Sequence, residues 1–160
     1  LAQDEGRVES AGALILRHIE GSPARENLLH TYAVLAVQGA QLMEEEGEAV
    51  RAEKMLERVR EDLLEVGAPR SHVGMVHSGI GHMRFSQERY PDAARAFRLA
   101  LSTGWDPNGA VRRSLVAALV NQAARATNTG DCGTASHYAR EALQVVPDDP
   151  QALRILARCG

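Results

Sequence analysis

Two short helices are predicted in the stretch 77–101, HSGIGHMRFSQERYPDAARAFRLAL. Apolar residues recur at helical spacing around Ile80, and a second segment with apolar residues at the same spacing opens at Pro91. The connection, residues 86–90, is too short to allow anything but antiparallel neighbours. The sequence therefore predicts a helical hairpin at this place.

Glycines on the first of these helices predict that the two helices touch closely. Gly74, Gly79 and Gly81 each disfavour a helix by roughly 1 kcal/mol relative to alanine. Three of them on one helix indicate that neighbouring side chains or backbone approach at these points. Ala93 and Ala100 on the second helix supply the matching small surface.

This hairpin resembles a tetratricopeptide repeat (TPR), in which a Leu-Gly pair on the first helix packs against an alanine–aromatic–alanine face on the second. The positions that match this pattern are Ile80, Gly81, Tyr90, Ala93, Phe97 and Ala100. The sequence departs from the pattern at His77, where a large aromatic residue is common, and at Glu88, where glycine usually makes the turn.

Two further segments repeat the same features. The segment that follows has a turn glycine and a face of small residues, and the segment that precedes has a looser version of both. The residues are Gly130, Ala135, Ala139 and Ala142 in the first, and Ala40, Gly47, Ala52, Leu56 and Val59 in the second. The equivalent residues Ala52, Ala93 and Ala135 are 41 and 42 residues apart. This spacing exceeds the roughly 34-residue unit of the standard repeat and resembles the longer repeats of kinesin light chains.

The resemblance implies one all-α domain over residues 1–160, a right-handed superhelix of TPR-like hairpins. It divides into an N-terminal helix (1–22), repeats at 23–67, 68–105 and 106–148, and a final helix (149–160) that is either a cap or the first half of a further repeat. All six prolines fall at predicted helix boundaries. Helices are predicted at 7–20, 24–45, 48–66, 71–86, 91–103, 107–128, 132–145 and 150–159.

The net charge and the distribution of apolar residues bear on which kinds of partner the protein is expected to bind. The net charge of −3 gives no electrostatic reason to expect nucleic acid or an anionic membrane surface. No apolar run approaches the roughly 18 residues of a membrane-spanning helix, so no membrane insertion is expected.

The two cysteines and the first two residues carry information on the cellular location of the protein. Cys132 begins one predicted helix and Cys159 ends the next, so both lie at the same end of an antiparallel pair. They form either a disulfide or two free thiols. The start, Leu1-Ala2, resembles the end of a signal-peptidase site, with an arbitrary first residue as the alternative. A bacterial periplasmic or envelope location fits a disulfide, and the cytoplasm is the alternative.

The sequence predicts no enzyme, metal or cofactor. His72, His77 and His82 recur every five residues, which places successive side chains about 140° apart on a helix rather than on one face. Gly79-Ile80-Gly81 has no preceding strand that would make it a dinucleotide-binding turn. No serine or cysteine lies in a nucleophile motif.

The resemblance implies a concave groove, lined by the first helix of each pair, that binds a peptide or protein segment. Its candidate residues are Gln38, Gln41, Glu45, Ser78, His82, Phe85, Asn121, Ala124 and Asn128. Without lysine or arginine at these positions, we expect no grip on a peptide carboxylate. The amides are suited to the backbone of an extended segment, and solvated helix faces are the alternative.

A protein-binding scaffold is thus the predicted function. One alternative is a self-assembling homo-oligomer that uses the edge of the last helix, where Leu153, Ile155 and Leu156 are apolar. Another is a regulatory module of a larger protein.

Overall fold

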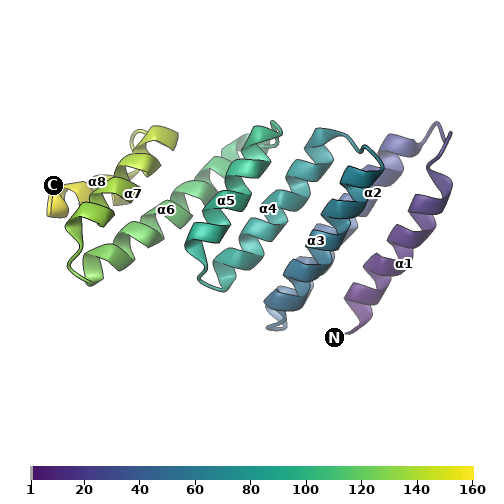
Figure 1. Cartoon of the computed structure of the whole chain (residues 1–160), viewed down its shortest axis with the longest axis horizontal. Coiled ribbons are helices and arrows are strands. Elements are labelled where there is room, and N and C mark those ends of the chain that lie inside the picture. Colours follow the sequence, from purple (N-terminus) through teal and green to yellow (C-terminus); the bar gives the residue numbers. More distant parts are fainter. Residues whose placement is uncertain (1) are drawn as a thin grey trace.

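The computed structural model describes residues 2–160, and these residues form α-helices joined by short turns, with no strand among them. Leu1 lies outside the described residues; with Ala2 it forms the pair that resembles the end of a signal-peptidase site. The helices stand side by side along the long axis, from the N-terminus at one end to the C-terminus at the other (Figure 1). They are α1 (Ala2–His18), α2 (Arg25–Glu45), α3 (Ala49–Glu65), α4 (Arg70–Ser86), α5 (Tyr90–Ser102), the short 3-10 helix η1 (Pro107–Gly109), α6 (Ala110–Asn128), α7 (Cys132–Val145) and α8 (Pro150–Cys159). The predicted all-α fold of consecutive helical hairpins is confirmed.

The helices form two layers, which we call the inner and the outer layer. In the inner layer α2 contacts α4, α4 contacts α6, and α6 contacts α8. In the outer layer α1 and α3 touch, and the backbones of α3, α5 and α7 stay further apart within residues 2–160, although an ion pair of 2.9 Å between Arg98 and Glu141 joins α5 to α7. The inner helices therefore pack against one another along the stack more closely than the outer helices do. The first helix of each predicted pair belongs to that layer.

Glycines bring α4 against its neighbours, as the sequence predicted. A Cβ atom added at Gly81 would lie 2.5 Å from the nearest atom of the Phe97 ring, and one at Gly79 would lie 3.1 Å from Leu56. The contact at Gly81 corrects one detail, because this glycine receives the large Phe97 ring rather than the small Ala93 or Ala100. The close approach therefore allows a fully buried aromatic side chain between α4 and α5.

Two clusters of buried side chains make up the core. One lies among α1, α2, α3 and α4, and the other among α5, α6, α7 and α8. The helix α5 joins them, because Ala96 belongs to the first cluster whereas Phe97 belongs to the second. Alanines fill much of both clusters, which lets neighbouring helices pack closely.

Some helix ends lie where the prolines predicted them, and others differ. Asp149 caps α8 by accepting a hydrogen bond of 2.9 Å from the Ala152 amide. The helix predicted at 107–128 is interrupted, because Asn108 and Gly109, within η1, have φ of +52° and +71°, and α6 begins only at Ala110. At the N-terminal end, α1 begins at Ala2 rather than at the predicted residue 7.

The turns between paired helices share one backbone conformation. Gly47 and Gly130, which the sequence assigns to equivalent turns, have φ of +84° and +80°. Glu88 has a φ of +57° at the corresponding place, although left-handed backbone disfavours residues other than glycine. The hairpin of α4 and α5 therefore keeps the turn without its usual residue.

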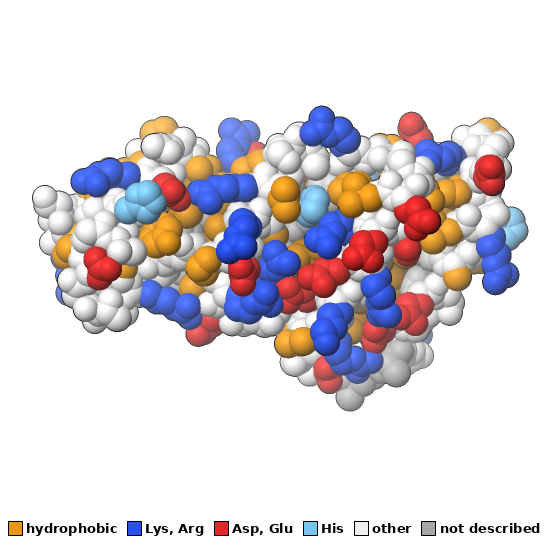
Figure 2. Space-filling model, viewed as in Figure 1, with side chains coloured by type: hydrophobic (Ala, Val, Ile, Leu, Met, Phe, Trp, Pro, Cys, Tyr) orange, Lys and Arg blue, Asp and Glu red, His pale blue; other side chains and the backbone are white. Residues whose placement is uncertain are grey.

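The outer layer presents a mixed surface. Acidic and basic side chains are interspersed over the face in Figure 2, with separate hydrophobic patches between them. Within residues 2–160 no helix is both long and apolar enough to cross a membrane.

Candidate functional site

The inner layer carries the residues that the sequence assigned to a groove. Gln41 and Glu45 are exposed on α2, His82 is exposed on α4, and Asn128 is exposed on α6. Ser78 on α4 is half-buried. These side chains come from three parallel helices of one layer, so they are distributed along one face.

Gln38 lies elsewhere than expected. It lines a groove between α1 and α2, together with Leu35 and Leu42, at the N-terminal end of the stack. We call this the α1–α2 groove. Gln38 therefore does not share a pocket with the candidates on α4 and α6.

His82 lies over the aromatic centre of the second hairpin. Its ring packs edge-on against Phe97, with the ring centroids 5.1 Å apart. Desolvation by the surrounding protein lowers the pKa of His82, and the negative charge of Glu44 opposes this effect. One side of His82 is therefore covered by protein while the residue stays exposed on the other, and the lowered pKa leaves the imidazole neutral near pH 7, with one donor and one acceptor nitrogen.

Two candidates are already engaged within the fold. Phe85 packs edge-on against Tyr90 at 5.0 Å between centroids and belongs to the lining of the second core cluster. The Asn121 side chain donates a hydrogen bond of 2.8 Å to the Ala117 carbonyl of its own helix. Both residues therefore have less surface available for a ligand than the exposed Gln41, His82 and Asn128.

A pocket between α6 and α8 contains basic residues that the sequence analysis missed. Ala124 and Asn128 of α6 line it together with Arg154 and Arg158 of α8. The candidate positions themselves carry no lysine or arginine, but the two arginines of α8 lie beside two of those positions. The four-residue spacing of the two arginines was the available signal, because it places both on one face of a helix. We call this the α6–α8 pocket, and its chemistry is suited to an anionic group beside a small apolar surface.

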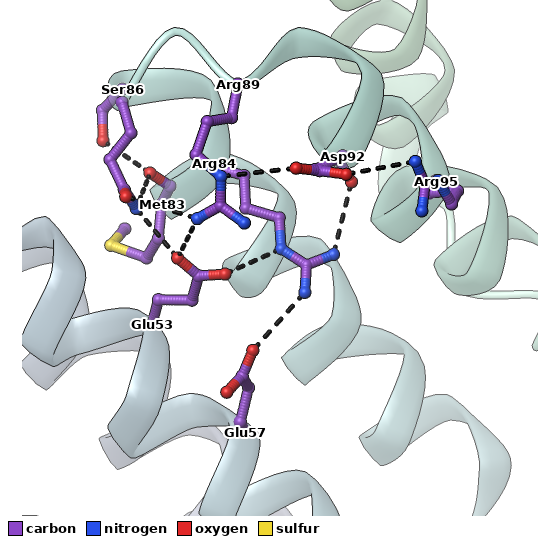
Figure 3. A network of polar contacts seen from close by, with 9 residues as sticks. Glu53, Glu57, Met83, Arg84, Ser86, Arg89, Asp92 and Arg95 are labelled. Atoms are coloured by element: carbon purple, nitrogen blue, oxygen red, sulfur yellow. Dashed lines mark hydrogen bonds and ion pairs between the residues drawn. The ribbon is translucent and has the colours of Figure 1, made fainter.

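A second missed feature is a polar network between α3 and the hairpin of α4 and α5 (Figure 3). Glu53 on α3 accepts hydrogen bonds from Arg84 Nε at 2.8 Å, from Gln87 Nε2 at 2.9 Å and from Arg89 Nη1 at 2.7 Å. Arg89 also contacts Asp92, at 3.3 Å. The network fixes α3 against α4 and the turn that follows α4.

The environment of Glu53 stabilises its charged form. Burial raises the pKa of the Glu53 carboxyl, but the hydrogen bonds from Arg84 and Gln87 and the charges of Arg89 and Arg84 outweigh burial, so the pKa is lowered. Since only 6% of Glu53 is exposed, this carboxylate has a structural role rather than a ligand-binding one.

His77, the departure from the TPR pattern, is half-buried on α4. Desolvation lowers its pKa, and the charges of Arg60 and Arg84 lower it further. The neutral ring therefore substitutes for the aromatic side chain that the pattern places there.

The two cysteines meet at one end of the α7–α8 hairpin. Cys132 and Cys159 are joined as a disulfide, with their Cα atoms 5.0 Å apart, a separation within the usual range for such a bond. The bond attaches the end of α8 to the start of α7.

Comparisons with known proteins support the fold. No protein-family model and no curated protein matches the sequence. Among solved structures, the chain is similar to the crystal structure of BtubC (BKLC) from P. vanneervenii, with a TM-score of 0.53 and 15% sequence identity. The match covers 96% of this chain and 62% of that one, so this chain spans less than two thirds of its neighbour's length. At this identity the likeness extends to a TPR-like helical repeat fold.

Proposed function

We propose that the chain is a non-enzymatic scaffold of the TPR family, with long repeats similar to those of kinesin light chains, that binds a segment of another polypeptide on its inner face. The observation that carries the proposal is the alignment of exposed polar side chains from α2, α4 and α6 on one closely packed layer.

Hydrogen-bonding capacity supports this function. Gln41 and Asn128 each have an amide that can both donate to and accept from the backbone of an extended segment. His82, between them along the stack, adds a neutral imidazole. Hydrogen bonds from these side chains to the backbone of a ligand would not depend on the ligand's sequence, so the side chains are suited to binding a main chain.

The α6–α8 pocket adds selectivity at one end of the face. Arg154 and Arg158 are both exposed and both line it. Arginine side chains bind carboxylate groups through paired hydrogen bonds. We therefore expect a ligand with an acidic group near the end that reaches α8.

Rigid hairpins support a preformed surface. The Glu53 network fixes the first repeat to the second, and the disulfide fixes α8 to α7. A surface that is already ordered loses less conformational entropy on binding.

The test is a crosslinking capture of partners with the wild-type chain and two triple variants. The inner variant is Gln41→Ala, His82→Ala, Asn128→Ala, and all three residues are exposed, so the fold should be retained. The outer control is Lys54→Ala, Arg95→Ala, Gln144→Ala, with one exposed residue on each of α3, α5 and α7.

The expected result is a partner that the wild type and the outer control retain and the inner variant loses. With that partner purified, Arg154→Ala, Arg158→Ala should weaken binding and reduce its sensitivity to salt. Equal capture by all three proteins would place binding elsewhere and reject the proposal.

A further inference from the structure

Two histidine side chains meet where α4 begins beside α2. The rings of His30 on α2 and His72 on α4 are tilted against each other, with their centroids 5.2 Å apart. His72 is half-buried and is the third residue of α4, whereas His30 is exposed. The pair therefore lies in the contact between two neighbouring helices of the inner layer.

The buried edge of the His72 ring has no group that could accept a second proton. Its Nδ1 atom is buried and has no hydrogen-bond partner among residues 3–160. A neutral imidazole can leave this atom unprotonated and carry its proton on Nε2, but an imidazolium carries a proton on both nitrogens. Protonation of His72 therefore places a charged donor at a buried position without an acceptor, which is costly unless the ring moves.

The charges around His72 also disfavour a proton there. Desolvation by the surrounding protein lowers the pKa of His72, the charge of His30 lowers it further, and the charge of Glu26 raises it. Both of these charged groups lie on α2, and no titratable group on α3, α5 or α6, the other helices that contact α4, contributes among residues 3–160. The first turn of α4 contains Arg70 and no acidic residue, and the positive end of the helix dipole disfavours a further cation.

The first turn of α4 is held less firmly than the turn that follows. No side chain caps the helix, which Pro69 precedes. The Arg70 side chain donates an exposed hydrogen bond of 2.9 Å to the Ser102 carbonyl. Close packing begins at the buried Gly74, where an added Cβ would lie 2.6 Å from the Cβ of Trp105. The first turn can therefore move while the rest of α4 stays packed.

We propose that protonation of His72 beside His30 releases the first turn of α4 from α2, so that mild acid opens the inner layer at this point. The proposal rests on the paired rings and on the buried Nδ1 atom without an acceptor. In the open form the His72 imidazolium reaches solvent and lies further from His30. This response to pH goes beyond the peptide-binding function proposed above and does not depend on it.

The pH range follows from the direction of the pKa shift. The pKa of His72 is lower in the packed form than its ordinary value of 6.5, which the ring regains in solvent. The packed form therefore binds fewer protons, so its stabilisation is complete above about pH 6.5 and is lost as pH falls below that value. Burial also lowers the pKa of His77 and His82 on the same helix, so the test needs a local measurement.

Hydrogen exchange at the start of α4 supplies that measurement. Exchange of the amides of residues 72–75 is followed by NMR from about pH 7.5 to about pH 5 and corrected for the intrinsic effect of pH on exchange. The amides of α6 report whether the whole chain unfolds. Trp105, the single tryptophan, packs on Gly74 and gives a second readout of the same turn by fluorescence.

Three substitutions by glutamine, which stays neutral throughout this pH range, separate the histidines. His72→Gln removes the proposed switch, and His30→Gln removes the neighbouring charge from an exposed position. His82→Gln is the matched control, because His82 also lies on α4 with a lowered pKa, but its ring packs on Phe97 instead.

In the wild type and in His82→Gln, protection of residues 72–75 should fall by up to about tenfold for each pH unit below 6.5, the effect of one bound proton. Protection of α6 should stay constant. His72→Gln should show no such fall, and His30→Gln should show a smaller one, together with a higher pKa of His72 measured from its ring resonances.

Four results would overturn the proposal. They are constant protection of residues 72–75 in the wild type, an equal loss in α6, a fall in His72→Gln that matches the wild type, and a pKa of His72 that His30→Gln leaves unchanged. If His72→Gln loses protection already at pH 7.5, His30→Gln decides, because its exposed position should retain the fold.

Discussion

Gly81 of α4 faces the ring of Phe97 on α5 so closely that an added Cβ would lie 2.5 Å from the nearest ring atom. Phe97 is fully buried in the second core cluster, so a shift of its ring would disturb the packing of its neighbours. The pairing explains why a helix contains glycine where alanine would be the better helix former.

Gly81→Ala should therefore lower the free energy of unfolding. Overpacking a core in this way destabilises by about 1–3 kcal/mol, which exceeds the gain of about 1 kcal/mol in helix propensity. Urea denaturation followed by circular dichroism measures the change. Gly6→Ala on α1 is the control, because a Cβ there meets nothing within 4 Å and should stabilise the protein. Equal effects of both substitutions would show that the contact with Phe97 does not limit the size of residue 81.

How much of the structure can be predicted from the sequence depends on how far apart in the chain the interacting residues lie. The hairpin at 77–101 was predictable, since helix period, turn and glycines are local signals. The Glu53 network was not, because Arg84 and Arg89 lie 31 and 36 residues away and no spacing rule connects them to Glu53.

The candidate site divides in the same way. The exposed positions of Gln41, His82 and Asn128 follow from helix periodicity. The α6–α8 pocket does not, because it depends on the approach of α8 to α6 after the intervening helix α7 has reversed the chain. Repeat boundaries and ligand contacts stay predictions.

The left-handed turn at Glu88 gives a second prediction, in which two substitutions separate backbone from side chain. Glu88→Gly and Glu88→Ala both remove the exposed ion pair with Arg125, but only glycine relieves the φ of +57°. The Glu88→Gly variant should have a free energy of unfolding about 1 kcal/mol higher than the Glu88→Ala variant. This is the reverse of the order of glycine and alanine in a helix interior. Thermal denaturation of the two variants measures the difference. If the Glu88→Ala variant proved the more stable of the two, residue 88 would not have a left-handed backbone conformation in solution.

Acid should weaken the contact between the first two repeats. The pKa of Glu53 is lowered in the folded chain, so its stabilisation is present above the unfolded value and is lost as pH falls through the folded value. With an ordinary value of 4.5, this loss begins near that pH and continues below it. Denaturation curves between about pH 7 and about pH 3 should show a smaller loss for Glu53→Gln than for the wild type.

The same substitution should lower stability at neutral pH. Glu53→Gln removes the charge that Arg84 and Arg89 contact, at an expected loss of about 1–3 kcal/mol. Glu61→Gln, at an exposed position of the same helix, should change neither the stability nor its pH dependence. A pH profile for Glu53→Gln that matched the wild type would assign the acid sensitivity to other carboxylates.

The bond between Cys132 and Cys159 should determine whether α8 stays in place. It closes a loop with a sequence separation of 27, for which chain entropy predicts a stabilisation of about 3.5 kcal/mol. Apart from the buried Ala152, the helix packs on the core through Ile155 and Leu156, which are only partly buried. Without the bond we expect α8 to detach from α6 and α7 before the remaining helices unfold.

Hydrogen exchange with and without a reductant measures this directly. Reduction should raise exchange in α8 and the start of α7, while α2, α3 and α4 keep their protection. The double variant Cys132→Ser, Cys159→Ser should exchange like the reduced wild type and should not respond to the reductant. Because Arg154 and Arg158 lie on α8, its release should also abolish the α6–α8 pocket. Two reactive thiols in the protein before reduction, or protection of α8 that reduction leaves unchanged, would contradict this role of the disulfide.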